Sequence, residues 1–150
     1  MVKAEPDRAR AADPECLCLR LRQAARVVSQ IYDQHLAASG LTVSQYGLLG
    51  HLRAFDGSGI GSLAEKLIMD PTTLTRSLRP LERRGLLEVR SAPSDRRARS
   101  LHLTASGREA LAAARPAWRA AQGHVAQALG SSDDTRLRAA LDRLLERLNA

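Results

Sequence analysis

The sequence has few of the features that define disulfide-rich, membrane and β-rich proteins. Aromatic residues make up only 3% of its 150 residues, and its apolar 44% is mostly leucine and alanine, which is typical of packed helices rather than of a β-sandwich. Two cysteines, Cys16 and Cys18, are too few for a disulfide scaffold. There is no run of 18 apolar residues and no apolar signal-peptide core, so we expect a cytoplasmic protein without membrane spans.

The sequence also lacks the motifs of common enzymes and metal-binding proteins. It has no nucleophile elbow, no Walker loop and no paired-carboxylate motif in a suitable context. The glycine-rich residues 57–61 are not followed by Gly-Lys-Ser/Thr, so we interpret them as a plain connection. Four histidines are scattered without an HExxH or CxxC grouping: His35, His51, His102 and His124. We therefore expect no enzyme, no metal site and no cofactor.

The chain carries an excess of positive charge. The formal net charge is +7, and only Lys3 and Lys66 among the 23 basic residues are lysines. A basic surface favours a polyanionic partner, such as nucleic acid or an anionic membrane. An arginine-rich surface that is merely solvated is the plainer alternative, so charge alone does not identify the partner.

Hydrophobic periodicity predicts a mainly helical chain with one β-hairpin. Apolar residues recur at steps of three and four in several segments, which predicts helices over residues 14–38, 43–55, 61–67, 71–84, 105–129 and a last helix after Gly130. Two short strands, 86–90 and 100–103, are joined by a predicted basic turn over 91–99. The polar residues 1–13 are expected to form a flexible tail. A short helix, a tight turn, a second helix and a basic hairpin together make a winged helix-turn-helix.

Capping residues mark several helix ends. Thr42 and Gln45 have the spacing of a capping box, and Asp70-Pro71 is a strong helix start. Residues 131–134 offer a serine cap and first-turn acids to the last helix. Pro80 and Pro116 lie inside predicted helices and should bend them, because a proline ring displaces the carbonyl four residues earlier.

The helix that begins at Pro71 has one apolar and one polar face. Leu74, Leu78 and Leu81 are spaced to face a core. The opposite face carries hydroxyl and guanidinium groups that could reach base edges and phosphates, from Thr72, Thr73, Thr75, Arg76, Arg79 and Arg83. An ordinary amphipathic helix with a solvated arginine face is the alternative.

The hairpin strengthens the interpretation that this region binds DNA. Its predicted tip contains Arg96, Arg97 and Arg99, and arginine side chains fit the negative potential of a narrow minor groove. We expect Asp95 to pair with Arg97 and orient it. A solvated charge run is the alternative for the hairpin alone, but a basic hairpin directly behind a helix-turn-helix favours duplex DNA. A basic chromatin-type protein without sequence preference remains a second alternative.

Four motifs resemble the multiple antibiotic resistance regulator (MarR) family. They are Leu63-Ala64-Glu65, Asp70-Pro71-Thr72-Thr73-Leu74-Thr75-Arg76, Leu81-Glu82-Arg83-Arg84-Gly85-Leu86, and Asp95-Arg96-Arg97 through Leu103-Thr104-Ala105-Ser106-Gly107. The resemblance covers residues 15–150 in order. It implies a transcription regulator, usually a repressor, that binds a pseudo-palindromic operator as a homodimer. It places Thr72, Thr73, Thr75 and Arg76 on the recognition helix, and Asp95 and Arg97 on the wing.

The resemblance also implies that residues 1–150 form a single domain with a DNA-binding part and a dimerisation part. Residues 43–104 would form the DNA-binding lobe, and residues 14–38 and 105–150 the interlocked dimerisation helices. The last helix independently favours a dimer, because an exposed apolar stripe usually marks an interface. The stripe consists of Leu137, Leu141, Leu144, Leu145 and Leu148.

Two kinds of signal remain open. The resemblance implies small aromatic or phenolic ligands, bound between the DNA-binding lobe and the dimerisation helices. The candidates near such a crevice are Tyr46, His51, Arg53, Phe55 and Trp118, although a lone aromatic residue is more often part of a core.

The second kind of signal is oxidation. The spacing of Cys18, Tyr32 and Tyr46 resembles the organic-hydroperoxide-sensing branch of the family, in which the equivalent of Cys18 is the reactive thiol and Tyr32 supports it. Arg22 replaces a second supporting tyrosine and could also activate a thiol. If Cys16 and Cys18 both lay on a helix, their side chains would diverge by about 200°, which disfavours a disulfide between them. A small buried hydrophobe is the alternative role for each cysteine.

Overall fold

The structure, a computed structural model, describes residues 15–92 and 95–149, without the side chains of residues 92 and 95–98. The tail predicted for residues 1–13 lies outside the described residues. The elements follow in the order α1 (Leu17–Leu36), the 3-10 turn η1 (Ala37–Ser39), α2 (Val43–Ala54), α3 (Ile60–Leu67), α4 (Pro71–Arg83), β1 (Leu87–Ala92), β2 (Asp95–Leu103), α5 (Ala105–Leu129) and α6 (Ser131–Leu148).

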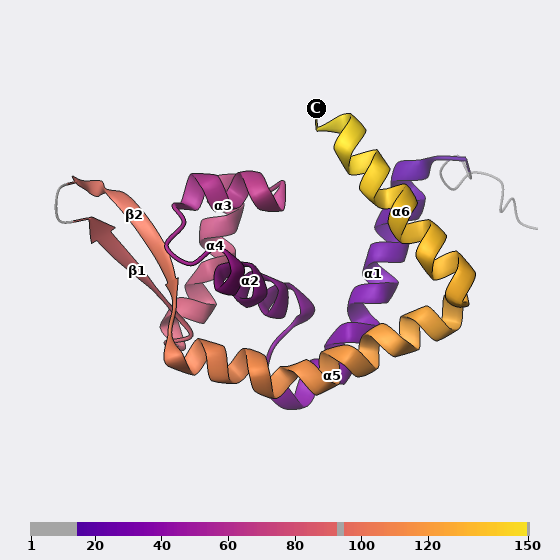
Figure 1. Cartoon of the computed structure of the whole chain (residues 1–150), viewed down its shortest axis with the longest axis horizontal. Helices are drawn as coiled ribbons and strands as arrows, with labels where there is room; N and C mark the ends of the chain where they lie inside the picture. The colour runs from indigo at the N-terminus through magenta and orange to yellow at the C-terminus, as the bar shows by residue number, and fades with distance from the viewer. Residues whose placement is uncertain (1–14, 93–94, 150) are drawn as a thin grey trace, which may run out of the picture.

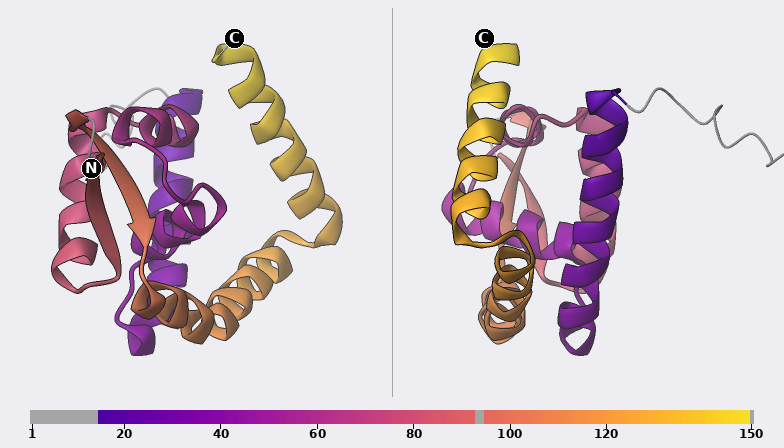
Figure 2. Two further views of the ribbon diagram at one scale, coloured as in Figure 1. Left: turned by 60° about the vertical axis from the view of Figure 1, so that its left-hand side comes forward. Right: turned by 90° about the vertical axis from the view of Figure 1, so that its right-hand side faces the viewer.

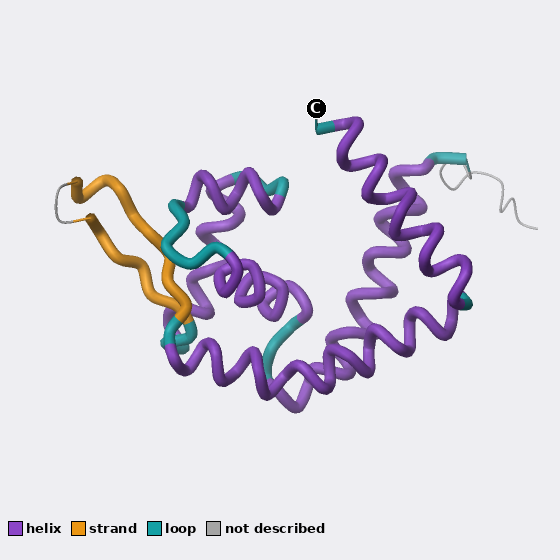
Figure 3. The backbone as a smooth tube through the Cα atoms, viewed as in Figure 1, coloured by secondary structure: helices purple, strands orange, loops and turns teal. Residues whose placement is uncertain are grey.

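The elements form two groups joined by one long helix. Helices α2, α3 and α4 gather with the β1–β2 hairpin, and α5 runs from this lobe to the end where α1 and α6 lie (Figures 1 and 3). Helices α1 and α6 overlap in Figure 1, but the turned views in Figure 2 separate them. The predicted mainly helical, winged helix-turn-helix architecture with long flanking helices is confirmed.

The predicted caps of α2 and α4 are confirmed. The Thr42 hydroxyl accepts a hydrogen bond from the Gln45 amide at 3.2 Å, and the Gln45 side chain accepts one from the Thr42 amide at 3.1 Å. The Asp70 carboxylate accepts from the Thr73 amide at 2.9 Å, and Pro71 occupies the first turn. Each bond satisfies an amide that the helix itself leaves without an acceptor, so local sequence fixes both helix starts.

The start of α6 differs from the prediction. Gly130, at a φ of +82°, is the residue before the helix and provides no side-chain cap, so the predicted serine cap is wrong. Asp133 and Asp134 do lie in the first turn, where carboxylates complement the helix dipole. Helix α4 continues through Pro80, and α5 continues through Pro116 with a bend near its middle (Figure 1).

The hairpin strands are longer than predicted. Antiparallel pairing extends from Leu87 opposite Leu103 to Ser91 opposite Arg99, and a shift in register then places Ala92 opposite Asp95. The predicted turn over residues 91–99 is therefore wrong. Backbone hydrogen bonds can continue a two-stranded ladder through residues that show no apolar alternation, so the hydrophobic pattern missed this extension.

Leucine fills the core that joins α2, α3 and α4 to the hairpin. The large side chains that are completely buried are Leu36, Leu49, Leu52, Leu63, Leu74, Leu81, Leu87 and Leu101. Leu111 and Ala114 of α5 close one side of the same cluster. Full burial of each leucine contributes about 1.5–3 kcal/mol, so this core holds the three short helices and the hairpin as one unit.

Candidate nucleic-acid interface

Helix α4 buries one face and presents the other to solvent, as predicted. Leu74, Leu78 and Leu81 are at most 4% exposed. The outer side lines a shallow pocket of about 310 Å³, formed by Pro71, Thr72, Thr75, Arg76 and Arg79. Because the inner leucines fix the rotation of the helix, the threonines and arginines are held outward on a rigid support.

Some outer side chains of α4 already form hydrogen bonds within the protein, and others do not. The Thr75 hydroxyl donates to the Pro71 carbonyl at 2.8 Å, and the Thr73 hydroxyl contacts the Asp70 carboxylate at 3.3 Å. Among the described residues, the side chains of Thr72, Arg76 and Arg79 make no hydrogen bond or ion pair. Their polar groups can therefore bind an external ligand without breaking a contact in the protein.

Other arginines are used to hold the fold together. Arg84 donates to the Gly40 carbonyl at 2.9 Å, and Arg108 donates to the Leu103 carbonyl at 2.7 Å. Arg90 pairs with Glu88 on the same strand. This division separates structural arginines from Arg76 and Arg79, a distinction that net charge could not make.

The wing presents its basic segment along strand β2 rather than in a loop. Arg99 is exposed and lies opposite Ser91 in the ladder. Asp95 and Arg97 belong to β2, but their side chains lie outside the described part, so their predicted ion pair stays a prediction. The strand gives these residues a regular spacing along one projecting element (Figure 1).

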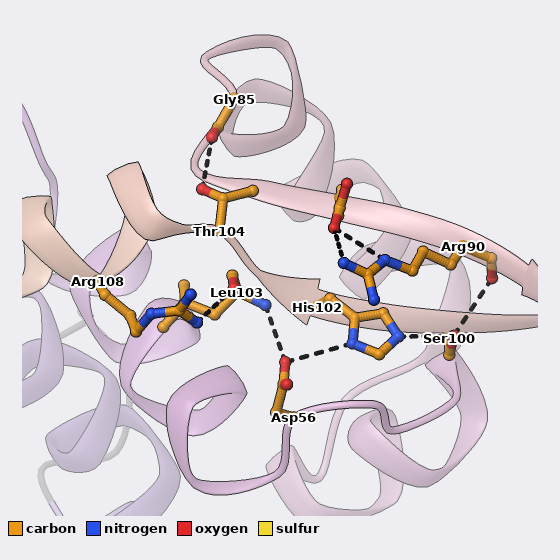
Figure 4. Close-up of polar contacts among 9 residues, drawn as sticks. Asp56, Gly85, Arg90, Ser100, His102, Leu103, Thr104 and Arg108 are labelled. Carbon is orange, nitrogen blue, oxygen red and sulfur yellow. Dashed lines mark hydrogen bonds and ion pairs between the residues drawn. The ribbon is translucent and has the colours of Figure 1, made fainter.

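The base of the wing is fastened to the loop between α2 and α3. The Gly57 amide donates to the Leu101 carbonyl at 2.8 Å, and the Leu101 amide donates to the Ser58 carbonyl at 2.9 Å. The Asp56 carboxylate accepts from the Leu103 amide at 3.0 Å and lies 3.6 Å from the ring of His102 (Figure 4). These contacts orient the wing relative to the helix-turn-helix.

Electrostatics favour the charged form of Asp56. The Leu103 amide, followed by His102 and Arg108, holds the pKa of the Asp56 carboxyl below its ordinary value. The other ring nitrogen of His102 lies 2.9 Å from the Ser100 hydroxyl. Sequence reasoning missed the contact between Asp56 and His102. Asp56 follows a helix and His102 lies on a strand, and nothing in the local sequence shows that these two side chains meet.

The structure brings only some of the candidate effector residues together. Tyr46 of α2 and Trp118 of α5 stack with ring centroids 5.5 Å apart and planes 19° apart. His51 is exposed, with its ring 2.8 Å from the Gly47 carbonyl. The Phe55 ring lies under the Lys66 ammonium at 4.5 Å. The Tyr46–Trp118 pair is thus the aromatic contact between α2 and α5.

Both cysteines are free and exposed at the beginning of α1. Cys16 has extended backbone and precedes the helix, so the angle expected for two helical residues does not apply to it and Cys18. Tyr32 lies fourteen residues beyond Cys18, which is about 21 Å along a helix, so the two cannot touch within one chain. Tyr32 is buried instead, and this burial raises the pKa of its phenol despite the nearby Arg138.

Comparison with known proteins agrees with this geometry. A model of the MarR family matches residues 41–98. The transcriptional activatory protein BadR of Rhodopseudomonas palustris is 34% identical over 113 residues, which are 73% of this chain and 65% of that protein. The chain thus spans slightly less than two thirds of BadR. In the part of the chain that the structure describes, no helix is long and apolar enough to cross a membrane.

Solved structures give the same result over nearly the whole chain. The M. tuberculosis transcriptional regulator MosR in complex with DNA is 37% identical, covers 89% of this chain and 96% of its own, and has a TM-score of 0.80. The transcriptional repressor CouR bound to a 23-mer DNA duplex is 29% identical, with coverage of 87% and 92% and a TM-score of 0.79. The chain therefore belongs to the MarR family and is a DNA-binding transcription regulator with a winged-helix fold.

Proposed function

We propose that this protein binds a pseudo-palindromic operator as a homodimer, with α4 of each protomer in a major groove. The observation that carries the proposal is the outer face of α4, where Thr72, Arg76 and Arg79 are exposed and uncommitted above a buried leucine face. Arginine forks recognise guanine edges and short hydroxyls approach phosphates closely, which suits a helix in the major groove. The DNA complexes of MosR and CouR support this placement.

The wing completes the proposed DNA interface. Arg97 and Arg99 on β2 would lie along the sugar-phosphate backbone or enter the minor groove beside the α4 site, with Asp95 orienting Arg97. Thr73 and Thr75 act mainly through their methyl groups and remaining lone pairs, because their hydroxyl groups already contact Asp70 and Pro71. Base selectivity is therefore assigned first to Arg76, Arg79 and Thr72.

The apolar surface supports the dimer. Of the eight large hydrophobic side chains that are exposed in the described part, six lie on α1, on α6 or at the end of α5: Leu17, Val27, Leu129, Leu137, Leu145 and Leu148. No residue of α6 is buried. A second copy related by a two-fold axis would cover this surface and place the two α4 helices about one DNA turn apart.

We further propose that the protein is a repressor released by a small aromatic or phenolic acid. The Tyr46–Trp118 stack supports this site, since it lies between α2 of the DNA-binding lobe and α5, the helix that leads to the proposed dimer interface. An aromatic ligand that inserts beside the stack would change the orientation of the DNA-binding lobe relative to α5. Such a ligand should protect the protein against unfolding, and a Trp118→Leu variant should lose that protection.

Oxidation of a thiol is the second candidate signal, because Cys16 and Cys18 are both exposed and unpaired. Peroxide should release the wild-type protein from DNA and leave a Cys18→Ser variant bound. Equal release of both proteins would eliminate the thiol hypothesis.

The DNA-binding proposal is tested by fluorescence anisotropy on the upstream DNA of the coding gene, with random duplex for comparison. Arg76→Ala should weaken specific binding by about 5- to 150-fold, the range for losing one bidentate base contact. Arg53→Ala on α2 removes the same charge from an exposed position outside α4, the wing and α6, and serves as the control. If both variants bind like the wild type, α4 is not the recognition helix.

A further inference from the structure

Two histidines that are far apart in the sequence meet between α1 and α5. The Nε2 atom of His35 lies 3.2 Å from the Nδ1 atom of His124. The two rings are edge-to-face, with centroids 5.5 Å apart and planes at 72°. The residues are 89 positions apart, so this contact depends on the packing of α1 against α5 rather than on any local motif.

The spacing of the two nitrogens matches that of ligands on one metal ion. Two imidazole nitrogens bound to a tetrahedral Zn²⁺ at about 2.0–2.1 Å lie roughly 3.3–3.4 Å apart. The observed separation of 3.2 Å differs from this by only a few tenths of an ångström. A metal ion could replace the contact between the two nitrogens after rotation of the rings.

We propose that His35 and His124 form a two-histidine binding site for a divalent transition-metal ion of the zinc type. Imidazole nitrogen is a ligand that Zn²⁺, Ni²⁺ and Cu²⁺ accept, whereas Mg²⁺ and Ca²⁺ prefer oxygen. His35 is half-buried and His124 is exposed, so an ion can reach the pair from solvent.

The number of protein ligands defines the character of the site. Within residues 15–92 and 95–149, no group of three or more histidine, cysteine, aspartate or glutamate side chains could hold a metal ion. Water molecules would therefore fill the remaining positions around the ion. Such a site exchanges its metal readily, in contrast to a closed structural zinc site with four protein ligands.

Metal binding at this pair would join the C-terminal part of α1 to the C-terminal half of α5. Helix α1 ends at Leu36, directly after His35, and His124 lies beyond the proline at position 116 of α5. A ligand that binds only the folded state raises its stability according to its concentration relative to Kd. The metal should thus stabilise the chain through these two side chains together, and removal of either one should abolish the effect.

The experiment is thermal unfolding of the full chain with increasing ZnCl₂, and isothermal titration for stoichiometry. Wild-type protein should bind one Zn²⁺ per chain, and its Tm should rise by about 3–6 °C at free Zn²⁺ about tenfold above Kd. His35→Gln and His124→Gln should each lose the rise. His51→Gln and a Cys16→Ser/Cys18→Ser double variant should keep it, which separates the pair from the other imidazole and thiol groups.

Each result decides the proposal. Loss of the rise in both glutamine variants, with the two controls unchanged, supports the site. No rise in the wild type, a rise that survives either glutamine substitution, or loss in the cysteine variant would overturn it. Because both histidines reach solvent, the metal-free variants should unfold within a few degrees of the wild type, and circular dichroism verifies their fold.

Discussion

Gly107, in the first turn of α5, is the glycine at which the structure has least room for a side chain. A Cβ atom placed there would lie 1.9 Å from the Leu86 carbonyl oxygen and 2.9 Å from its carbon. Carbon and oxygen atoms that are not bonded need more than about 3 Å, so the Leu86 backbone would have to retreat by about 1 Å or more. That carbonyl also accepts from the Thr104 amide at 3.3 Å, a bond that the displacement would break.

Gly107→Ala should therefore destabilise the protein strongly. Overpacking costs about 1–3 kcal/mol and a lost hydrogen bond about 1 kcal/mol, so we expect a loss of about 3 kcal/mol in the free energy of unfolding. For a chain of this length the Tm should fall by about 6–12 °C.

The same substitution at Gly50 provides the matched control for Gly107→Ala. A Cβ at Gly50 would meet nothing within 4 Å, and an alanine inside α2 should stabilise by about 0.5–1 kcal/mol. Urea and thermal unfolding followed by circular dichroism measure both effects. A Gly107→Ala variant as stable as the wild type would refute the packing argument at the base of the wing.

Three further outcomes are expected. Asp56→Asn should lower the Tm at pH 7, and this difference from the wild type should shrink toward pH 2. Folding lowers the Asp56 pKa, so the carboxylate stabilises the folded state above its ordinary pKa of about 4. That stabilisation is lost as the pH falls through the lower pKa of the folded state. A constant difference across pH would contradict this. Arg97→Ala should weaken binding to all duplexes and reduce the slope of log affinity against log salt by about 1, and an unchanged slope would exclude a phosphate contact. Leu145→Asp on α6 should shift the protein toward monomer in sedimentation experiments, and an unchanged sedimentation coefficient would place Leu145 outside the dimer interface.

Local sequence predicted the elements whose causes are local. The leucine spacing in Leu74, Leu78 and Leu81 identified the buried face of α4, since the helical period alone places these side chains together. The Thr42 capping box and the Asp70-Pro71 start were predictable because each hydrogen bond spans only three residues.

Contacts between distant segments could not be predicted in the same way. Asp56 meets the Leu103 amide across 47 residues, and His35 meets His124 across 89. A periodic pattern shows which face of a helix or strand must be covered, but it does not show what covers it. Sequence reasoning therefore treated the four histidines as scattered, although the fold brings two of them into contact.

The leucines of α6 also show that a regular apolar pattern does not reveal which surface will cover it. Their spacing is as regular as that of α4, yet Leu137 is 43% exposed and Leu148 75% exposed, whereas Leu74 is fully buried. The pattern specifies an apolar contact in both helices, but only α4 buries its leucines completely within the chain. If a second copy covers α6, folding of that end depends on protein concentration, while the leucine core around α2, α3 and α4 is complete within one chain. Because α5 contributes to that core and also leads to α6, a change in the dimer interface can then reach the orientation of α4 through this one helix.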